Sequence, residues 1–307
     1  MRASVIICTY NRASHLTVAL ESLTRMVVPA NLDWEVLIVD NNSTDSTKLV
    51  ASDFAAKHPG RIRYIFEGAQ GKSFALNTGT REARGEILAF TDDDVTFDSN
   101  WLAELIGTFE RLGCAGVGGK IVPVWTSSKP SWYQEDGPGK LSPAIVSFDM
   151  GENPCPIKTA LFGANMAFKR EMFLKYGDFR PDLGLSGETR IGAEDSEFCR
   201  RLIKSGEVLI YAPTAIVYHP VEKYRTEQSY FQSWYLGRGR ASVREAGIPL
   251  NAIRYFGVPR YLLLILFKDA VKWLVSFNPK RRFFYKLEVF ETIGRIQESR
   301  ISSSARP

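Results

Sequence analysis

The chain has 307 residues and a formal net charge of +5, and 45% of its residues are apolar, 12% aromatic and 24% charged. These values are ordinary for a folded globular protein and exclude a disordered, collagen-like or polytopic membrane chain. The length predicts about two domains, or one large α/β domain with an extension.

Four widely spaced cysteines without a C-x-x-C pair argue against a disulfide scaffold and a cysteine-rich zinc site, and they fit a reducing compartment. The first residues lack the apolar core of a secretory signal peptide, so we expect a cytoplasmic protein. Residues 1–219 carry 23 Lys and Arg against 27 Asp and Glu, whereas residues 220–307 carry 16 against 7. This distribution argues against nucleic acid as a partner and places one basic surface at the C-terminal end.

Short apolar runs alternate with amphipathic helical patterns in the first 112 residues. Strands are predicted at Ala3–Cys8, Trp34–Val39, Arg61–Phe66 and Ile87–Thr91, and helices at His15–Met26, Ser46–Lys57, Lys72–Arg84 and Ser99–Leu112. The alternation predicts βαβ units and therefore a largely parallel sheet between layers of helices. In such sheets ligands bind beyond the carboxyl ends of the strands.

The second half of the chain is less regular. Residues 122–156 are rich in Pro, Gly, Ser and Trp, which predicts long loops. Regular structure is expected again at Thr159–Phe168, then helices at Arg170–Tyr176 and Glu194–Ser205, and two short strands, Val208–Tyr211 and Ala215–Tyr218, that Pro213 separates. Beyond Tyr224 the pattern is helical and basic.

Polar loops follow the first two predicted strands, as Thr9–Arg12 and Asp40–Asp45. A carboxylate at the carboxyl end of a strand, followed by Asn and Ser in a turn, can hydrogen-bond a ribose or a base. The alternative is that Asn42, Ser43 or Thr44 caps the next helix.

Two glycine-containing segments fail to match nucleotide-binding fingerprints. Gly71–Gly79 lacks the Walker A spacing, and Gly116–Lys120 is too short for a dinucleotide-binding loop. A kinase and an NAD-dependent enzyme are therefore disfavoured.

Three adjacent carboxylates, Asp92, Asp93 and Asp94, directly follow an apolar strand. They repel one another, so a bound cation should stabilise them. Carboxylate oxygens suit Mg²⁺ or Mn²⁺, with phosphates and water completing the coordination. The alternative is a solvated acidic turn before the helix at Ser99.

A second acidic pair, Glu194 and Asp195, opens a predicted helix. Acidic residues in a first turn often only complement the helix dipole. His219 ends a predicted strand, and a lone histidine is usually structural. It becomes a metal ligand if the fold brings it to the aspartate cluster.

Six motifs stand in one order along residues 1–220: Thr9-Tyr10-Asn11-Arg12, Asp40–Asp45, Gly71–Gly79, Asp92–Asp94, Gly163-Ala164-Asn165 and Glu194-Asp195. Together they resemble the family-2 glycosyltransferases of the GT-A fold. The resemblance implies an α/β fold with a Rossmann-like, mostly parallel sheet. It also implies a nucleotide-sugar donor, one divalent metal (Mn²⁺ or Mg²⁺), and inversion at the anomeric carbon by single displacement.

The resemblance also implies roles for individual residues. The nucleotide-sugar site would be lined by Thr9, Tyr10, Asn11, Arg12, Asp40, Asn42, Lys72, Asn77, Asp92 and Asp93. Asp94 would hold the metal, and Gly163, Ala164 and Asn165 would lie on the acceptor side. His219 would complete the coordination of that metal if the fold brings it to the aspartate cluster. Asp195 would be the general base that takes the proton of the acceptor hydroxyl, and Glu194 could exchange roles with it because both open the same helix.

The family's processive members carry a Gln-x-x-Arg-Trp motif after the base, and the nearest segment here, Gln232–Tyr235, lacks its Arg-Trp pair. We therefore expect one sugar per encounter, from a UDP-, dTDP- or GDP-linked donor to a glycan or lipid-linked acceptor. The alternatives are a sugar-phosphate nucleotidyltransferase and a non-catalytic nucleotide-sugar-binding scaffold. The absence of glycine from Cys8–Ala13 disfavours the first, and the presence of both the metal cluster and the base disfavours the second.

Residues 254–286 combine apolar and basic side chains. Tyr261–Phe267 is an uncharged apolar run of seven residues, whereas a membrane-spanning helix needs about 20. The surrounding Lys and Arg residues favour a helix that lies in the interface of an anionic membrane. The alternatives are docking on the catalytic domain or on a second copy in a homodimer.

The expected organisation follows from these patterns. Residues 1–220 form the catalytic domain, in which about 1–120 bind the nucleotide sugar and about 121–220 form the acceptor side. Residues 221–307 form a helical basic extension. We expect the protein in the cytoplasm, peripheral on the inner face of the plasma membrane.

Overall fold

The structure is a computed structural model that describes residues 1–137, 139–185 and 191–304. The chain divides into two compact units. The N-terminal unit comprises Met1–Val124, Val146–Pro181 and Glu194–Pro220, and the C-terminal unit comprises Trp125–Ile145, Asp182–Ala193 and Val221–Pro307. Two segments that precede residue 220 thus belong with the C-terminal helices. The functional labels of the two parts stay predictions.

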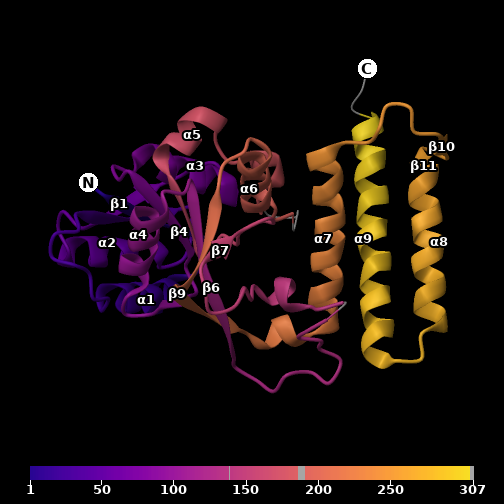
Figure 1. Ribbon diagram of the computed structural model, residues 1–307, viewed down its shortest axis with the longest axis horizontal. Helices are drawn as coiled ribbons and strands as arrows, with labels where there is room; N and C mark the ends of the chain where they lie inside the picture. The colour runs from indigo at the N-terminus through magenta and orange to yellow at the C-terminus, as the bar shows by residue number, and fades with distance from the viewer. Residues whose placement is uncertain (138, 186–190, 305–307) are drawn as a thin grey trace. The chain divides into compact units, whose positions relative to one another are not determined.

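A single large sheet organises the N-terminal unit (Figure 1). Its strands are β1 (Ala3–Thr9), β2 (Trp34–Asp40), β3 (Ile62–Phe66), β4 (Ile87–Asp92), β5 (Thr96–Phe97), β6 (Gly116–Trp125), β7 (Cys155–Pro156), β8 (Met166–Lys169) and β9 (Leu209–Val221). Their order is β3-β2-β1-β4-β8-β6-β9-β5, and β7 pairs with β9. β1 to β4 are parallel, and β8 enters antiparallel between β4 and β6.

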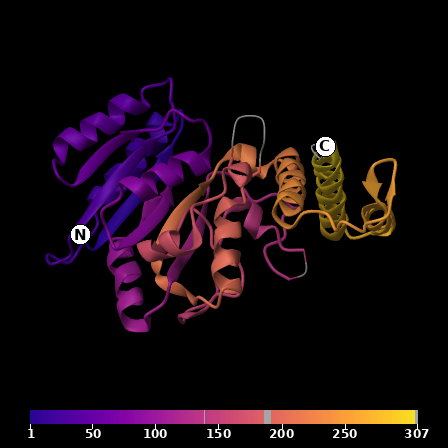
Figure 2. The ribbon, with the colours of Figure 1, turned by 90° about the horizontal axis from the view of Figure 1, so that it is seen from above.

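Helices cover both faces of this sheet (Figure 2). They are α1 (Ala13–Thr24), α2 (Thr47–Lys57), α3 (Lys72–Glu82), α4 (Trp101–Leu112), α5 (Arg170–Tyr176) and α6 (Glu194–Lys204). Ile7 of β1 packs in one core cluster with Trp101 of α4, whereas the adjacent Ile6 packs in the other with Leu76 of α3. Burial of both faces requires uninterrupted apolar runs in the central strands. The expected α/β fold with a mostly parallel central sheet is confirmed.

The end of the sheet differs from the prediction at Pro213. β9 is one strand of thirteen residues, so the prediction of two strands separated by this proline is wrong. Pro213 falls between two stretches of pairing, with β7 at Ile210–Tyr211 and with β5 at Val217–Tyr218. A proline is tolerated in a strand where no neighbour needs its N–H.

The register of the central strands brings the predicted polar loops to one edge. Thr9 at the end of β1 lies opposite Asp40 at the end of β2, and Cys8 lies opposite Asp92 at the end of β4. The loops that follow these three strands therefore begin at the same level. We call this the carboxyl edge of the sheet.

The C-terminal unit is helical, as expected. It contains α7 (Gln228–Ala246), α8 (Arg260–Val275) and α9 (Pro279–Ser304), with a small hairpin of β10 (Arg254–Tyr255) and β11 (Val258–Pro259). Short 3-10 helices lie at Ser142–Ile145, Pro181–Leu183 and Lys223–Thr226. α9 lies between α7 and α8 (Figures 1 and 2). Residues 125–145 pack on these helices through an aromatic cluster that includes Tyr133, Phe231 and Phe283.

Glycines allow α7 and α9 to approach closely. A Cβ atom on Gly239 of α7 would lie 1.9 Å from the carbonyl oxygen of Glu291, and one on Gly294 of α9 would lie 2.1 Å from that of Leu236. Beside this crossing, the buried carboxylate of Glu298 accepts hydrogen bonds from Arg240 at 3.0 Å and Arg244 at 2.6 Å. Backbone contact and buried ion pairs therefore fix how these two helices pack.

We expect Gly239→Ala to lower the thermal midpoint of unfolding. The added methyl group has to push α9 away, and overpacking of this kind typically costs about 1–3 kcal/mol. Gly107→Ala in α4 is the matched control, because its Cβ would meet only the mobile end of Arg111, 2.9 Å away. The control should gain up to about 1 kcal/mol from helix propensity. Scanning calorimetry measures both, and a midpoint for Gly239→Ala at or above that of the wild type would contradict the close crossing.

Candidate active site

The loops after β1 and β2 lock together at the carboxyl edge. Asn11 has a φ angle of +51°, a left-handed conformation that asparagine tolerates. Its side-chain oxygen accepts hydrogen bonds from the backbone N–H groups of Thr44 at 2.7 Å and Asp45 at 3.3 Å, and its own N–H donates to Ser43 Oγ at 2.9 Å. Asn11 thus holds the two loops in one arrangement.

Asp40 is buried at this edge with both oxygens engaged. Oδ1 accepts the backbone N–H of Ser43 at 3.0 Å, and Oδ2 accepts the hydroxyl of Tyr64 at 3.0 Å. Burial and the hydrogen bond to Asp40 raise the pKa of Tyr64 to about 12. Asn42 beside it has a φ angle of +63°. Tyr64 was missed at the sequence level, because it reads there as one more residue of an alternating strand.

Arg12 compensates two of the three consecutive aspartates. Its Nη1 donates to Asp93 Oδ1 at 3.1 Å and to Asp94 Oδ2 at 2.8 Å. Burial raises the pKa of Asp93 to about 6; the positive charge of Arg12 opposes this rise, and the negative charge of Asp94 adds to it. In this structure Arg12 therefore lies on the acidic cluster. Thr9 is buried beside it, whereas Tyr10 is half exposed at the same edge.

Asp92, Asp94 and His219 bring one ligand atom each within 4.8 Å of one another. His219 comes from β9, whose pairing with β5 sets Tyr218 opposite Thr96, two residues after Asp94. The imidazole Nδ1 lies 3.1 Å from the carbonyl oxygen of Pro220, and Nε2 lies 3.5 Å from Asp94 Oδ1. A bond from Nδ1–H to the carbonyl would direct the Nε2 lone pair toward the carboxylates.

This donor set fits a divalent cation. Two carboxylates and one imidazole suit Mn²⁺ better than Mg²⁺, which prefers oxygen ligands throughout.

Lys72 connects the aspartate cluster to the second acidic pair. Its Nζ donates to Asp92 Oδ1 at 2.7 Å. Burial by itself would lower the pKa of Lys72, but the negative charges of Asp92, Glu194 and Asp195 outweigh it and raise the pKa. The lysine is therefore a fixed positive charge between the two groups of carboxylates.

Asp195 is half-buried and held by backbone groups. Its Oδ2 accepts the N–H of Gly163 at 2.8 Å, and a Cβ atom on Gly163 would lie 3.4 Å from Lys72 Nζ and 3.5 Å from that same oxygen. Burial raises the pKa of Asp195, while Lys72 opposes the rise. Burial and the charge of Asp195 also raise the pKa of Glu194, again opposed by Lys72. Because Gly163 has no side chain, space remains beside the Asp195 carboxylate, whose raised pKa makes it a stronger base.

Two further predicted site residues, Asn77 and Asn165, also use their side chains on the protein itself. The Asn77 amide exchanges two hydrogen bonds with the backbone of Phe179, at 2.8 and 3.0 Å. Asn165 donates to the carbonyl oxygens of Lys120 and Ala215 and accepts from the indole of Trp101, all within 2.9 Å. The carbonyl oxygen of Ala164 accepts the hydroxyl of Thr91 at 2.9 Å. These contacts hold the backbone around the site.

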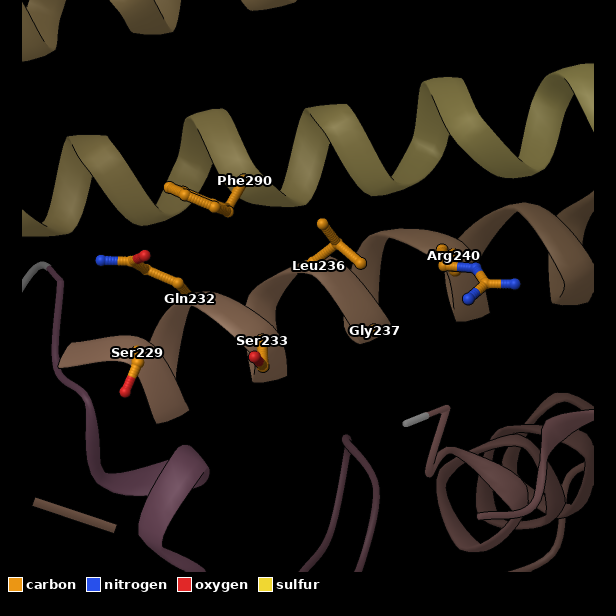
Figure 3. A pocket seen from close by; sticks show the side chains of 7 residues that line it. All are labelled: Ser229, Gln232, Ser233, Leu236, Gly237, Arg240 and Phe290. Atoms are coloured by element: carbon orange, nitrogen blue, oxygen red, sulfur yellow. The ribbon is translucent and has the colours of Figure 1, made fainter. Parts of the chain in front are cut away.

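The C-terminal unit has a pocket of its own, of about 350 Å³ (Figure 3). It is lined by Ser229, Gln232, Ser233, Leu236, Gly237 and Arg240 of α7 and by Phe290 of α9. Arg240 is the charged member of this lining, and its Nε donates to Glu298 at 3.0 Å. Arg240 is the side chain of this pocket best suited to bind an anion, and it is already paired with Glu298.

Comparisons with known proteins identify the family of this chain. The model of the glycosyl transferase family 2 matches residues 4–177. The chain is 30% identical to the glucosyl-dolichyl phosphate glucuronosyltransferase of Haloferax volcanii, over 90% of this chain and 88% of that protein. It is 28% identical to the succinoglycan biosynthesis protein ExoM of Rhizobium meliloti, over 71% and 67%.

Solved structures resemble the fold. A mannosyltransferase from Pyrobaculum calidifontis, in complex with GDP-Man and Mn²⁺, matches with a TM-score of 0.58 and 21% identity, over 100% of this chain and 76% of that one. S. aureus TarS in complex with UDP matches with a TM-score of 0.56 and 15% identity, over 100% and 92%. At these identities the similarity establishes the fold.

We expect the full chain to bind Mn²⁺, and His219→Ala to weaken that binding by at least about 10–100-fold, the range for loss of a group that supports a metal site. Paramagnetic resonance of free Mn²⁺ during a titration measures the affinity. His58→Ala is the control, because His58 stacks on Phe54 at the end of α2 and lies outside the cluster. Equal Mn²⁺ affinities for the two variants would show that His219 is not a metal ligand and has a structural role.

Proposed function

The chain belongs to glycosyl transferase family 2, and we propose that it transfers one sugar from a nucleoside diphosphate sugar to an acceptor hydroxyl group, with inversion at the anomeric carbon. The observation that carries this proposal is the carboxyl edge. Lys72 there bonds to Asp92 of the metal cluster and faces Asp195, the proposed base.

The metal cluster would help the leaving group of the proposed reaction to depart. Asp92, Asp94 and His219 would hold Mn²⁺. Such a cation neutralises the charge that develops on the leaving nucleoside diphosphate. Arg12 keeps Asp93 and Asp94 paired and adds a second positive charge for the diphosphate.

The loops after β1 and β2 would bind the nucleoside. Asp40 and Asn42 lie there with Thr9 and Tyr10, in a conformation that the side chain of Asn11 fixes. Because these loops are already ordered, donor binding does not have to offset the entropy cost of ordering them. Since their side chains bond to the protein, we assign Asn77 and Asn165 positioning roles within the same proposal.

Asp195 would act as general base. As the acceptor oxygen attacks the anomeric carbon, its proton passes to the Asp195 carboxylate, and the bond from that carbon to the diphosphate oxygen breaks. The N–H of Gly163 orients the carboxylate, and Lys72 keeps it ionised. Glu194 is the rival base, because it is buried on the same helix turn.

The relatives suggest a class of acceptor. The Haloferax volcanii relative is a glucuronosyltransferase for glucosyl-dolichyl phosphate, and by analogy we propose a lipid-linked sugar as the acceptor here. Since one structural neighbour carries GDP-Man and another UDP, the donor is best identified by experiment. A panel of UDP-, dTDP- and GDP-sugars with Mn²⁺, scored for nucleoside diphosphate release with and without a membrane extract, tests the proposal. Absence of release with every donor would contradict it.

We expect Asp195→Asn to lower turnover by about 10²–10⁴-fold, the usual contribution of general-base catalysis. Donor affinity should change little, because the base faces the acceptor. Glu197→Gln is the matched control: this acid lies in the same first turn of α6 but pairs with Arg201 at 2.7 Å. Wild-type turnover in Asp195→Asn together with an inactive Glu194→Gln would reverse the assignment of the base.

A second prediction concerns the pH dependence of turnover at saturating donor. The base has to be ionised, so turnover falls as pH decreases through its pKa. Because Lys72 lowers the pKa of Asp195, Lys72→Met should raise that pKa and move the acidic limb of the profile to higher pH. Lys72→Arg keeps the charge and should leave the limb near its wild-type position. An acidic limb that stays in place in Lys72→Met would contradict the coupling of the two residues.

A further inference from the structure

One face of the C-terminal unit exposes large apolar side chains in an unusual concentration. Ten of the exposed large apolar residues of the described chain lie within 253–277. Phe256, at the tip of the β10–β11 hairpin, and Phe277, just after α8, are 98% and 99% exposed. We define the docking face as Phe256, Leu264, Phe267, Leu274, Val275 and Phe277. Apolar side chains exposed in such a concentration mark interaction sites.

The exposed residues of α8 share one side of the helix. Leu264, Phe267, Val271 and Leu274 are exposed and recur at intervals of three and four residues. Leu262 is buried in the same helix, and α9 packs against α8 within this unit. The apolar stripe is therefore the side of α8 that its own unit leaves uncovered.

Basic side chains surround the stripe. Residues 254–286 contain eight Lys or Arg and a single acidic residue, Asp269. Asp269 is buried and accepts a hydrogen bond from Lys272 at 3.2 Å, so its charge is turned away from the surface. Arg260 and Lys268 are exposed on α8.

The start of α9 carries positive charge that the helix itself disfavours. Its first turn contains Lys280, Arg281 and Arg282 and no acidic residue, and all three basic side chains are exposed. Positive charge at a helix N-terminus opposes the helix dipole and costs stability. These basic residues begin three positions after Phe277, and an anionic surface opposite them would offset that cost.

We propose that the docking face binds the surface of an anionic lipid bilayer, with α8 lying in the plane of the interface. Exposed phenylalanines at both ends of the stripe and lysines beside it match the composition of interfacial helices. No described helix is long and apolar enough to cross a bilayer. A second copy is a poorer occupant, because it would bring two sets of eight basic residues together.

Vesicle binding tests this inference without donor or acceptor, so its failure and the failure of the proposed transferase activity are distinguishable. The full chain is incubated with vesicles of equal parts phosphatidylcholine and phosphatidylglycerol, or of phosphatidylcholine alone, and separated by flotation. We expect binding to the anionic vesicles at low salt and its loss at about 1 M salt, where the screening length is about 3 Å. Absence of binding at low salt, or equal binding to both kinds of vesicle, would overturn the proposal.

Paired substitutions locate the surface while leaving the core of the unit intact. Phe267→Gln with Leu274→Gln should lower the partition coefficient by at least about tenfold. Leu49→Gln with Leu174→Gln removes two equally exposed apolar side chains from α2 and α5 and should have no effect. Lys268→Gln with Lys280→Gln should lower the coefficient by about fivefold per residue, unlike Lys48→Gln with Lys204→Gln.

Two results would contradict the assignment of the face. Equal binding of the two apolar pairs would place the lipid contact elsewhere on the chain. A dimer in sedimentation that Phe267→Gln with Leu274→Gln dissociates, without vesicle binding by the wild type, would identify a second copy as the occupant.

Discussion

Repulsion between carboxylates gathered at one edge of the sheet is the constraint on which the N-terminal unit depends. Asp92–Asp94, Glu194 and Asp195 lie there with little exposure to water, and burial raises the pKa values of Asp93, Glu194 and Asp195. Two cations compensate for them. Arg12 bonds to two members of the aspartate cluster, and Lys72 bonds to Asp92 while facing the acids of α6. The sheet provides the scaffold, because parallel strands deliver their carboxyl ends to one edge.

The surplus of negative charge makes this edge suited to a divalent cation, and the rigidity of its loops makes it suited to catalysis. Side-chain amides hold the backbone around the edge: Asn11 joins the first two loops, and Asn165 bonds to the carbonyl oxygens of Lys120 and Ala215. Groups held in place before the substrate arrives need little reorganisation during the reaction. The polar residues of the edge therefore divide into those that would meet ligands and those that fix the backbone.

The C-terminal unit is built on the opposite balance of charge. Its buried Glu298 is paired with Arg240 and Arg244, and residues 220–307 carry 16 basic against 7 acidic residues. Close contact at Gly239 fixes α7 against α9, whereas α8 keeps one apolar side uncovered by its own unit. The packing of α7, α8 and α9 stabilises the unit, so α8 can expose an apolar side that would destabilise an isolated helix in water.

The sequence alone determined the α/β class, the acidic cluster and the elements of the first 112 residues except the two-residue strand β5, because apolar periodicity and an acidic triplet are local signals. It failed at Pro213, because the placement of this residue between the stretches of β9 that pair with β7 and with β5 is decided by distant segments of the chain. The tertiary structure decided which groups meet. His219 reaches Asp94 through strand pairing, Arg12 lies on the aspartates, and Lys72 joins Asp92 to the acids of α6. The physical reason is that these contacts join residues tens to more than a hundred positions apart, and the periodicity of a single sequence carries no record of which distant strands pair.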